Sequence, residues 1–228
     1  MIKKLKGYFT KSEALLWAVS ALFITLSFLI FDRCNYLTLV ASLIGITSLI
    51  FASKGNPVSQ VLMIIFSLLY GYISLGFAYY GEMITYLGMT LPMAVISLIQ
   101  WLKNPFRGKK SEVTVKSAGK KEIIIMLAVS AIVTFIFYFI LKALETANLY
   151  VSTLSVATSF AAAYLTALRC PYFALVYAMN DLVLIILWSY ASFFDISYLS
   201  VVICFLMFMI NDSYCFISWR KMQKRQMR

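Results

Sequence analysis

The sequence predicts an all-α integral membrane protein with eight transmembrane helices. Hydrophobic residues make up 62% of the 228 residues and charged residues only 13%, whereas a soluble domain is about half apolar and a quarter charged. The apolar residues form runs of about 20, the length that a helix needs to cross a bilayer. Membrane β-strands would alternate apolar and polar side chains, and these runs do not.

The expected spans follow one another with short connections, except for a polar, basic linker at residues 102–121 that divides the chain into halves. The first span follows Lys3, Lys4 and Lys6, as a signal peptide would. Its apolar run is long and no clear cleavage site follows, so we interpret it as a retained helix. In chain order the spans are residues 13–31, 36–53, 56–80, 82–101, 122–142, 150–167, 171–192 and 196–219.

Both ends of the chain are expected on the cytoplasmic side of the membrane. In this orientation all lysines and arginines except Arg33 and Lys142 lie on the cytoplasmic side, as the positive-inside rule requires. The net charge of +11 is then a topology signal with added attraction to anionic lipid. Nucleic-acid binding is not expected, because the basic residues are spread over short segments without a nucleic-acid motif.

Two groups of three helices are expected to form parallel repeats. Spans two to four and spans six to eight cross the membrane in the same directions, and span five connects them. The second helix of each group starts near a proline, Pro57 or Pro171, and the third ends on tryptophan and a basic residue, Trp101 or Trp219. Transporters with parallel repeats bind their substrate between the repeats near the midplane. The expected organisation is residues 1–35 as a basic segment and extra helix, 36–101 as the first repeat, 102–149 as the linker and connecting helix, 150–219 as the second repeat and 220–228 as a basic tail.

The seventh span carries an adjacent amide and acid, Asn180 and Asp181, near its middle. A charge at the bilayer centre costs roughly 2.5–3.5 kcal/mol on insertion scales, so it faces a protein interior. Tyr177, Asp181 and Trp188 share one helix face by their spacing, and Asn180 borders this face near Phe173. These side chains are candidates for a substrate site. The alternative is a purely structural role, in which they form a hydrogen-bond network that holds the helices together.

Three further polar side chains extend the candidate site: Gln60 at the start of the third span, Gln100 at the end of the fourth and Asn211 in the eighth. Gln100 and Asp212 lie near expected helix ends, so capping or snorkelling explains them about as well as ligand contact. Trp101 and Trp219 are expected in the interfacial aromatic belt.

The candidate side chains suit a small, flat, cationic or polar solute. Aromatic faces attract cations, a carboxylate balances a positive charge, and amides pair with hydroxyl or amide groups. The chain has no histidine, and its four cysteines form no CxxC pair. No metal or other cofactor is expected, and the absence of a P-loop motif argues against ATP hydrolysis.

Over most of residues 36–222 the sequence resembles the PnuC family of bacterial vitamin transporters, best known for nicotinamide riboside. The resemblance rests on Pro92 with QW at 100–101, on the Y-x-x-N-D-x6-W run from Tyr177 to Trp188, and on SWRK at 218–221. It implies a core of three, one and three helices related to the SWEET sugar transporters, with an extra N-terminal helix in some members. It also implies a location in the bacterial plasma membrane, a homotrimer and facilitated diffusion. The vitamin would be trapped through phosphorylation by a cytoplasmic nucleoside kinase.

The seventh span departs from the family pattern W-x-x-W-x-x-x-N. If Asp181 matches the asparagine, Ala174 and Tyr177 stand at the tryptophan positions, and this alignment keeps an aromatic side chain one turn before the polar residue. If Asn180 matches it, Phe173 and Val176 stand there. Thiamine and riboflavin, which other members are thought to carry, therefore stay open as substrates.

Three rival functions are weaker. An intramembrane aspartyl enzyme would use Asp181 with Asp212, but no GxGD-like motif surrounds either residue, and Asp212 is expected near the opposite end of its helix. Proton-coupled transport would make Asp181 the proton carrier. A scaffold without transport would leave the buried Asn180–Asp181 pair unexplained.

Overall fold

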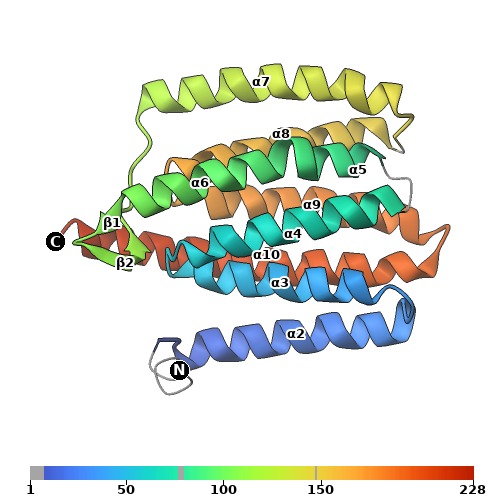
Figure 1. Cartoon of the computed structure of the whole chain (residues 1–228), viewed down its shortest axis with the longest axis horizontal. Coiled ribbons are helices and arrows are strands. Elements are labelled where there is room, and N and C mark those ends of the chain that lie inside the picture. The colour runs from blue at the N-terminus through green and yellow to red at the C-terminus, as the bar shows by residue number, and fades with distance from the viewer. Residues whose placement is uncertain (1–7, 77–79, 147) are drawn as a thin grey trace.

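The structure is a computed structural model that describes residues 8–76, 80–146 and 148–228, and its main feature is a bundle of long helices (Figure 1). Within these ranges eight helical segments are long and apolar enough to cross a membrane, as predicted. Lys3, Lys4, Lys6 and residues 77–79 of the expected third span lie outside the described residues. Tyr80, the expected last residue of that span, is instead the first residue of α5. The segments are α2 (Lys11–Phe31), α3 (Tyr36–Ser53), α4 (Val58–Gly76), α5–η1–α6 (Tyr80–Ile84, Thr85–Thr90 and Leu91–Lys103), α7 (Lys120–Ala143), α8 (Leu149–Ala167), α9 (Tyr172–Ser192) and η2–α10 (Ile196–Tyr198 and Leu199–Gln226).

Among the described residues, six of these segments form a closed ring. Each packs against the next in the order α3, α4, α6, α8, α9 and α10, and α10 packs back against α3. The extra N-terminal helix α2 packs outside the ring on α3 and α10, and α7 packs on α8 at the opposite side (Figure 1). The neighbour order within α3–α4–α6 is the same as within α8–α9–α10. This order is what two parallel repeats need, and the repeat itself stays a prediction.

The fourth span contains a π-helical turn, η1, between α5 and α6. Pro92 in the first turn of α6 has no N–H to donate to the carbonyl four residues earlier, so the regular bonding pattern is broken just after this turn. Single π turns are frequent at functional sites. Here η1 contributes Thr85 and Tyr86 to the central cavity described below.

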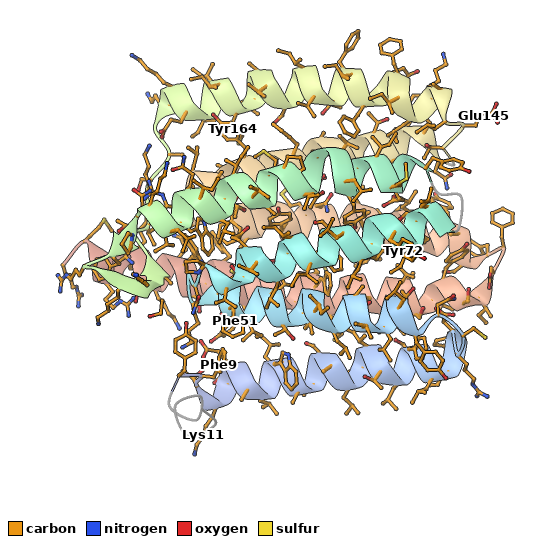
Figure 2. All side chains as sticks on the ribbon, in the orientation of Figure 1. Phe9, Lys11, Phe51, Tyr72, Glu145 and Tyr164 are labelled. Atoms are coloured by element: carbon orange, nitrogen blue, oxygen red, sulfur yellow. The ribbon has the colours of Figure 1, made fainter. Side chains whose placement is uncertain are left out.

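The helix α2 begins and α10 ends at the same end of the bundle, as an even number of spans requires (Figure 1). The labelled Lys11 lies at this end and Glu145 at the other (Figure 2). Between the two ends, the outer faces of α2 and α7 present apolar side chains such as Leu22, Leu29 and Phe135. The assignment of the basic end to the cytoplasm stays a prediction.

Part of the basic linker folds into a small β-hairpin rather than an open connection. Strand β1 (Pro105–Phe106) pairs antiparallel with β2 (Lys109–Val113). Val113 is fully buried, and its N–H donates to the carbonyl of Gly55 in the α3–α4 turn at 2.9 Å. Beyond the hairpin, the N–H of Lys116 donates to the carbonyl of Arg169 in the α8–α9 turn at 3.0 Å. The linker therefore ties together turns from both halves of the chain.

The expectation that Trp101 and Trp219 lie in an interfacial belt was wrong, because both side chains are fully buried inside the protein. The Trp101 Nε1–H donates to the carbonyl of Thr166 at the end of α8 (2.9 Å), and that of Trp219 donates to Ala52 at the end of α3 (2.7 Å). The two rings pack together with centroids 5.4 Å apart. Each tryptophan thus joins one triplet of helices to the other, at equivalent junctions.

Candidate functional site

A cavity lies inside the helix ring, between side chains from α3, α4, α5–η1, α8, α9 and α10. Its volume is about 90 Å³, enough for several water molecules. Five of the predicted site residues line it: Gln60, Phe173, Tyr177, Asn180 and Asp181. These residues come from two helices of different triplets, so the cavity lies between the predicted repeats, where transporters of this plan bind their substrates.

Asn180 is held in a fixed orientation by α8. Its side-chain Oδ1 accepts hydrogen bonds from the hydroxyls of Ser155 at 3.3 Å and Thr158 at 2.8 Å. Both hydroxyls come from α8, so this helix fixes the direction of the Asn180 side chain. Because its oxygen is occupied, the Asn180 amide faces the cavity chiefly as a hydrogen-bond donor.

Asp181 meets a second acid, Asp212, which the sequence interpretation had excluded as its partner. The carboxyl groups lie within hydrogen-bond reach of one another and both line the cavity. They are 4% and 3% exposed. The eighth span was expected to end at residue 219, which put Asp212 near its end. The helix α10 continues to Gln226, and Asp212 lies near its middle.

A third acid, Glu82, lines the same cavity from α5. From the sequence it was expected as the first residue of the fourth span, on the outer side of the membrane. The described residues that line the cavity include no lysine or arginine. In the described part of the chain, the lysines and arginines that form ion pairs do so with Glu13, Glu112 and Glu122 instead. The cavity is therefore acidic, and positive charge on a solute would complement it.

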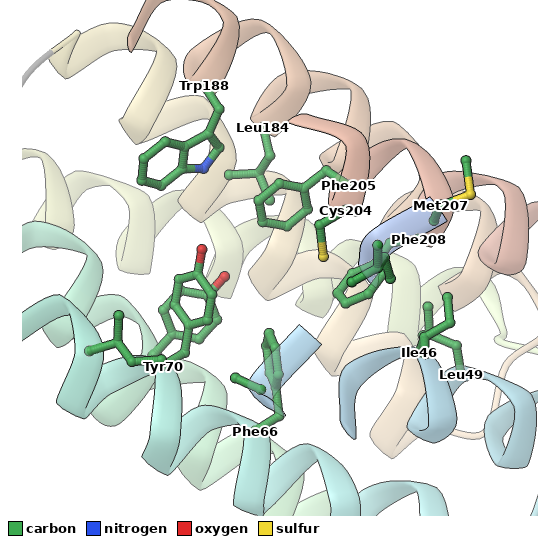
Figure 3. Close-up of a cluster of buried hydrophobic side chains, with 14 of the residues drawn as sticks. Ile46, Leu49, Phe66, Tyr70, Leu184, Trp188, Cys204, Phe205, Met207 and Phe208 are labelled. Atoms are coloured by element: carbon green, nitrogen blue, oxygen red, sulfur yellow. The ribbon is translucent and has the colours of Figure 1, made fainter. Parts of the chain in front are cut away.

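Two groups of aromatic rings line the same cavity. In the first group the rings of Phe173 and Tyr177 meet edge to face, with centroids 6.3 Å apart. In the second group Phe66 packs against Tyr86 at 5.8 Å and against Phe208 at 6.1 Å. Figure 3 shows Phe66 of α4 and Phe208 of α10 facing one another across the bundle. Only the first aromatic group was predicted, because the second is assembled from three helices that are distant in the sequence.

Three predicted site residues do not line this cavity. Trp188 lies two turns beyond Asp181, about 10 Å along the helix, and lines a neighbouring pocket with Glu82 and Tyr198. Asn211 faces α2, where its amide donates to Ser20 Oγ at 2.9 Å and to the carbonyl of Met207 at 2.8 Å. Gln100 is exposed on the outer surface of α6. The neighbours of Asn211 and Gln100, Asp212 and Trp101, point inward, and successive helical residues are turned by about 100°.

The chain is similar to known proteins over most of its length. A family model described as nicotinamide mononucleotide transporter matches residues 35–221. The nicotinamide riboside transporter PnuC of Neisseria mucosa is 27% identical over 227 residues, which cover 98% of this chain and 86% of that protein. The transporter of the same name from Haemophilus influenzae is 24% identical over 84% of this chain and 82% of that protein. A solved structure described as the crystal structure of the vitamin B3 transporter PnuC has the same fold, with a TM-score of 0.81, 24% identity and coverage of 96% of this chain and 94% of that one. The predicted fold class is confirmed.

Proposed function

The chain belongs to the nicotinamide mononucleotide transporter family, and from this we propose that it carries nicotinamide riboside across the bacterial plasma membrane. Its class is that of a multi-pass membrane transporter and not of an enzyme, because its relatives are transporters. The observation that carries the proposed substrate is the acidic, aromatic cavity inside the ring. Nicotinamide riboside has a flat ring with a fixed positive charge, a carboxamide and ribose hydroxyls.

The cavity offers a partner for each part of this solute. Asp181 offsets the ring charge, with rings of Phe173 and Tyr177 in position to stack. The Asn180 amide and Gln60 are available for the carboxamide and hydroxyls. The phosphate of nicotinamide mononucleotide would meet carboxylates and no basic side chain among the described lining residues. The site therefore favours the nucleoside over the nucleotide.

Transport proceeds by facilitated diffusion with alternating access, through rocking of the two triplets around the cavity. The triplets meet at α6–α8 and α3–α10, and each junction holds one tryptophan hydrogen bond. Phosphorylation by a cytoplasmic nucleoside kinase would make uptake one-way. A homotrimer, with both chain ends in the cytoplasm, completes the proposal.

Thiamine is the alternative substrate that a specific observation favours. It also carries a fixed positive charge on an aromatic ring, and the acidic cavity does not distinguish the two. Riboflavin lacks the fixed charge and is the weaker alternative.

Uptake into liposomes tests the proposed function. Labelled nicotinamide riboside should enter protein-containing vesicles faster than empty ones, equalise across the membrane when no ion gradient is present, and be unaffected by a protonophore. Enclosing a nucleoside kinase with ATP should raise the retained label. Entry no faster than in empty vesicles would contradict transport, and accumulation abolished by the protonophore would favour proton coupling.

A further inference from the structure

The two acids of the cavity form a pair between adjacent helices. Asp181 comes from α9 and Asp212 from α10, and their carboxyl groups lie within hydrogen-bond reach. A hydrogen bond between two carboxyl groups needs one proton between them, because an ionised carboxylate only accepts. Two like charges at this separation in a buried site do not both persist, as in other carboxyl pairs that share a proton.

The carboxyl oxygens of the pair that accept no hydrogen bond point to a ligand. Asp181 Oδ2 and Asp212 Oδ1 are buried, and neither accepts a hydrogen bond from any donor in the described residues. The basic side chains that form ion pairs within the described ranges bind other acids, and the whole sequence has no histidine. A buried carboxyl pair without a basic partner keeps a negative charge only where a positive group from outside the chain offsets it.

We propose that Asp181 and Asp212 act as one unit that shares a proton, carries a single negative charge, and serves as the counter-ion of a singly charged aromatic cation. This rests on the proposed function and deepens it, because it assigns Asp212 to the site and fixes the charge that the carboxyl pair presents. One negative charge matches the single positive charge of nicotinamide riboside. The rings of Phe173 and Tyr177 flank the pair and keep the cation in contact with π faces.

A shared charge has a consequence that two independent carboxylates would not have. Asparagine has the shape of a protonated aspartic acid and can donate from its amide to the remaining carboxylate. Asp181→Asn and Asp212→Asn should therefore each keep one negative charge at the same place. All variants are made in a Glu82→Gln background, because Glu82 also lines the cavity. In this background the double variant removes the charge while it keeps the shape of the cavity.

The test is equilibrium binding of nicotinamide riboside and of its reduced form, which has nearly the same size and no ring charge. The wild-type protein should prefer the cation by roughly 100-fold, the size expected for one partly screened charge pair. Each single variant should keep this preference within about tenfold. The double variant should bind both forms about equally, and unchanged affinity for the reduced form would verify that its cavity is intact.

A preference that survives in the double variant overturns the proposal, and so does a single variant that loses the preference as completely as the double. If the double variant does not fold, the two single variants decide, because both must stay within tenfold of the wild-type preference. Failure of the wild-type protein to bind nicotinamide riboside would overturn the proposed function as well. The two failures are thus distinguishable by the wild-type measurement.

Discussion

Replacing Trp219 with alanine is expected to lower the free energy of unfolding by about 3–5 kcal/mol, the range for truncating a fully buried aromatic side chain. The ring is 0% exposed and packs edge to face on Phe173, with centroids 4.9 Å apart. Its truncation also removes the hydrogen bond to Ala52 across the α3–α10 junction. Trp101→Ala should have a similar cost, because Trp101 occupies the equivalent junction with Thr166.

Thermal unfolding of the purified protein in detergent measures this effect. A domain of this size loses about 2–4 °C of Tm for each kcal/mol, so a decrease of roughly 10 °C is expected. Trp17→Ala is the matched control, because Trp17 is 41% exposed on α2 and its truncation opens no internal cavity. Equal decreases for Trp17→Ala and Trp219→Ala would contradict the assignment of Trp219 to the interior junction.

Asn180→Leu is expected to weaken nicotinamide riboside binding by roughly 100-fold, because it replaces a cavity-lining donor by an apolar group of similar volume. The change also leaves the hydroxyls of Ser155 and Thr158 without the oxygen to which they donate. Loss of a hydrogen bond to a buried polar group costs about 1–3 kcal/mol. Binding by isothermal calorimetry gives the affinity, and thermal unfolding of the same sample gives the stability.

Asn211→Leu is the matched control for this change. Asn211 is equally buried but bonds Ser20 and Met207 instead of lining the cavity. The substitution should lower Tm while it leaves affinity within about twofold. A large loss of affinity in Asn211→Leu with little loss in Asn180→Leu would contradict the proposal that the substrate binds in the central cavity.

The fold class was predictable because bilayer thickness sets helix length, so apolar runs and their basic flanks mark each span. Asn180 and Asp181 were found for a related reason, since a polar pair near mid-span is costly in lipid and must face the interior. Gln60, Phe173 and Tyr177 also line the cavity as predicted. Whether any of these side chains binds substrate stays a prediction.

The predictions that were wrong concern contacts between helices, which residue spacing along one helix does not determine. The belt interpretation of Trp101 and Trp219 relied on position along the membrane normal, whereas their direction around the helix puts them at buried junctions. Asp212 was judged a poor partner for Asp181 because α10 was expected to end at residue 219. The helix continues through seven further residues, all basic or polar except Met222. Glu82 was expected at the start of the fourth span, whereas α5 begins at Tyr80 and holds Glu82 at the cavity.

The acidic cavity as a site for a flat organic cation is tested most directly by calorimetric titration of the purified protein with nicotinamide riboside, thiamine, riboflavin and nicotinamide. The account predicts that nicotinamide riboside binds most tightly, that thiamine is the nearest competitor, and that the uncharged riboflavin and nicotinamide bind at least about tenfold more weakly. Thiamine as the tightest ligand would keep the site and change the substrate. Riboflavin or nicotinamide binding as tightly as the cations, or no binding by any of the four, would contradict the account.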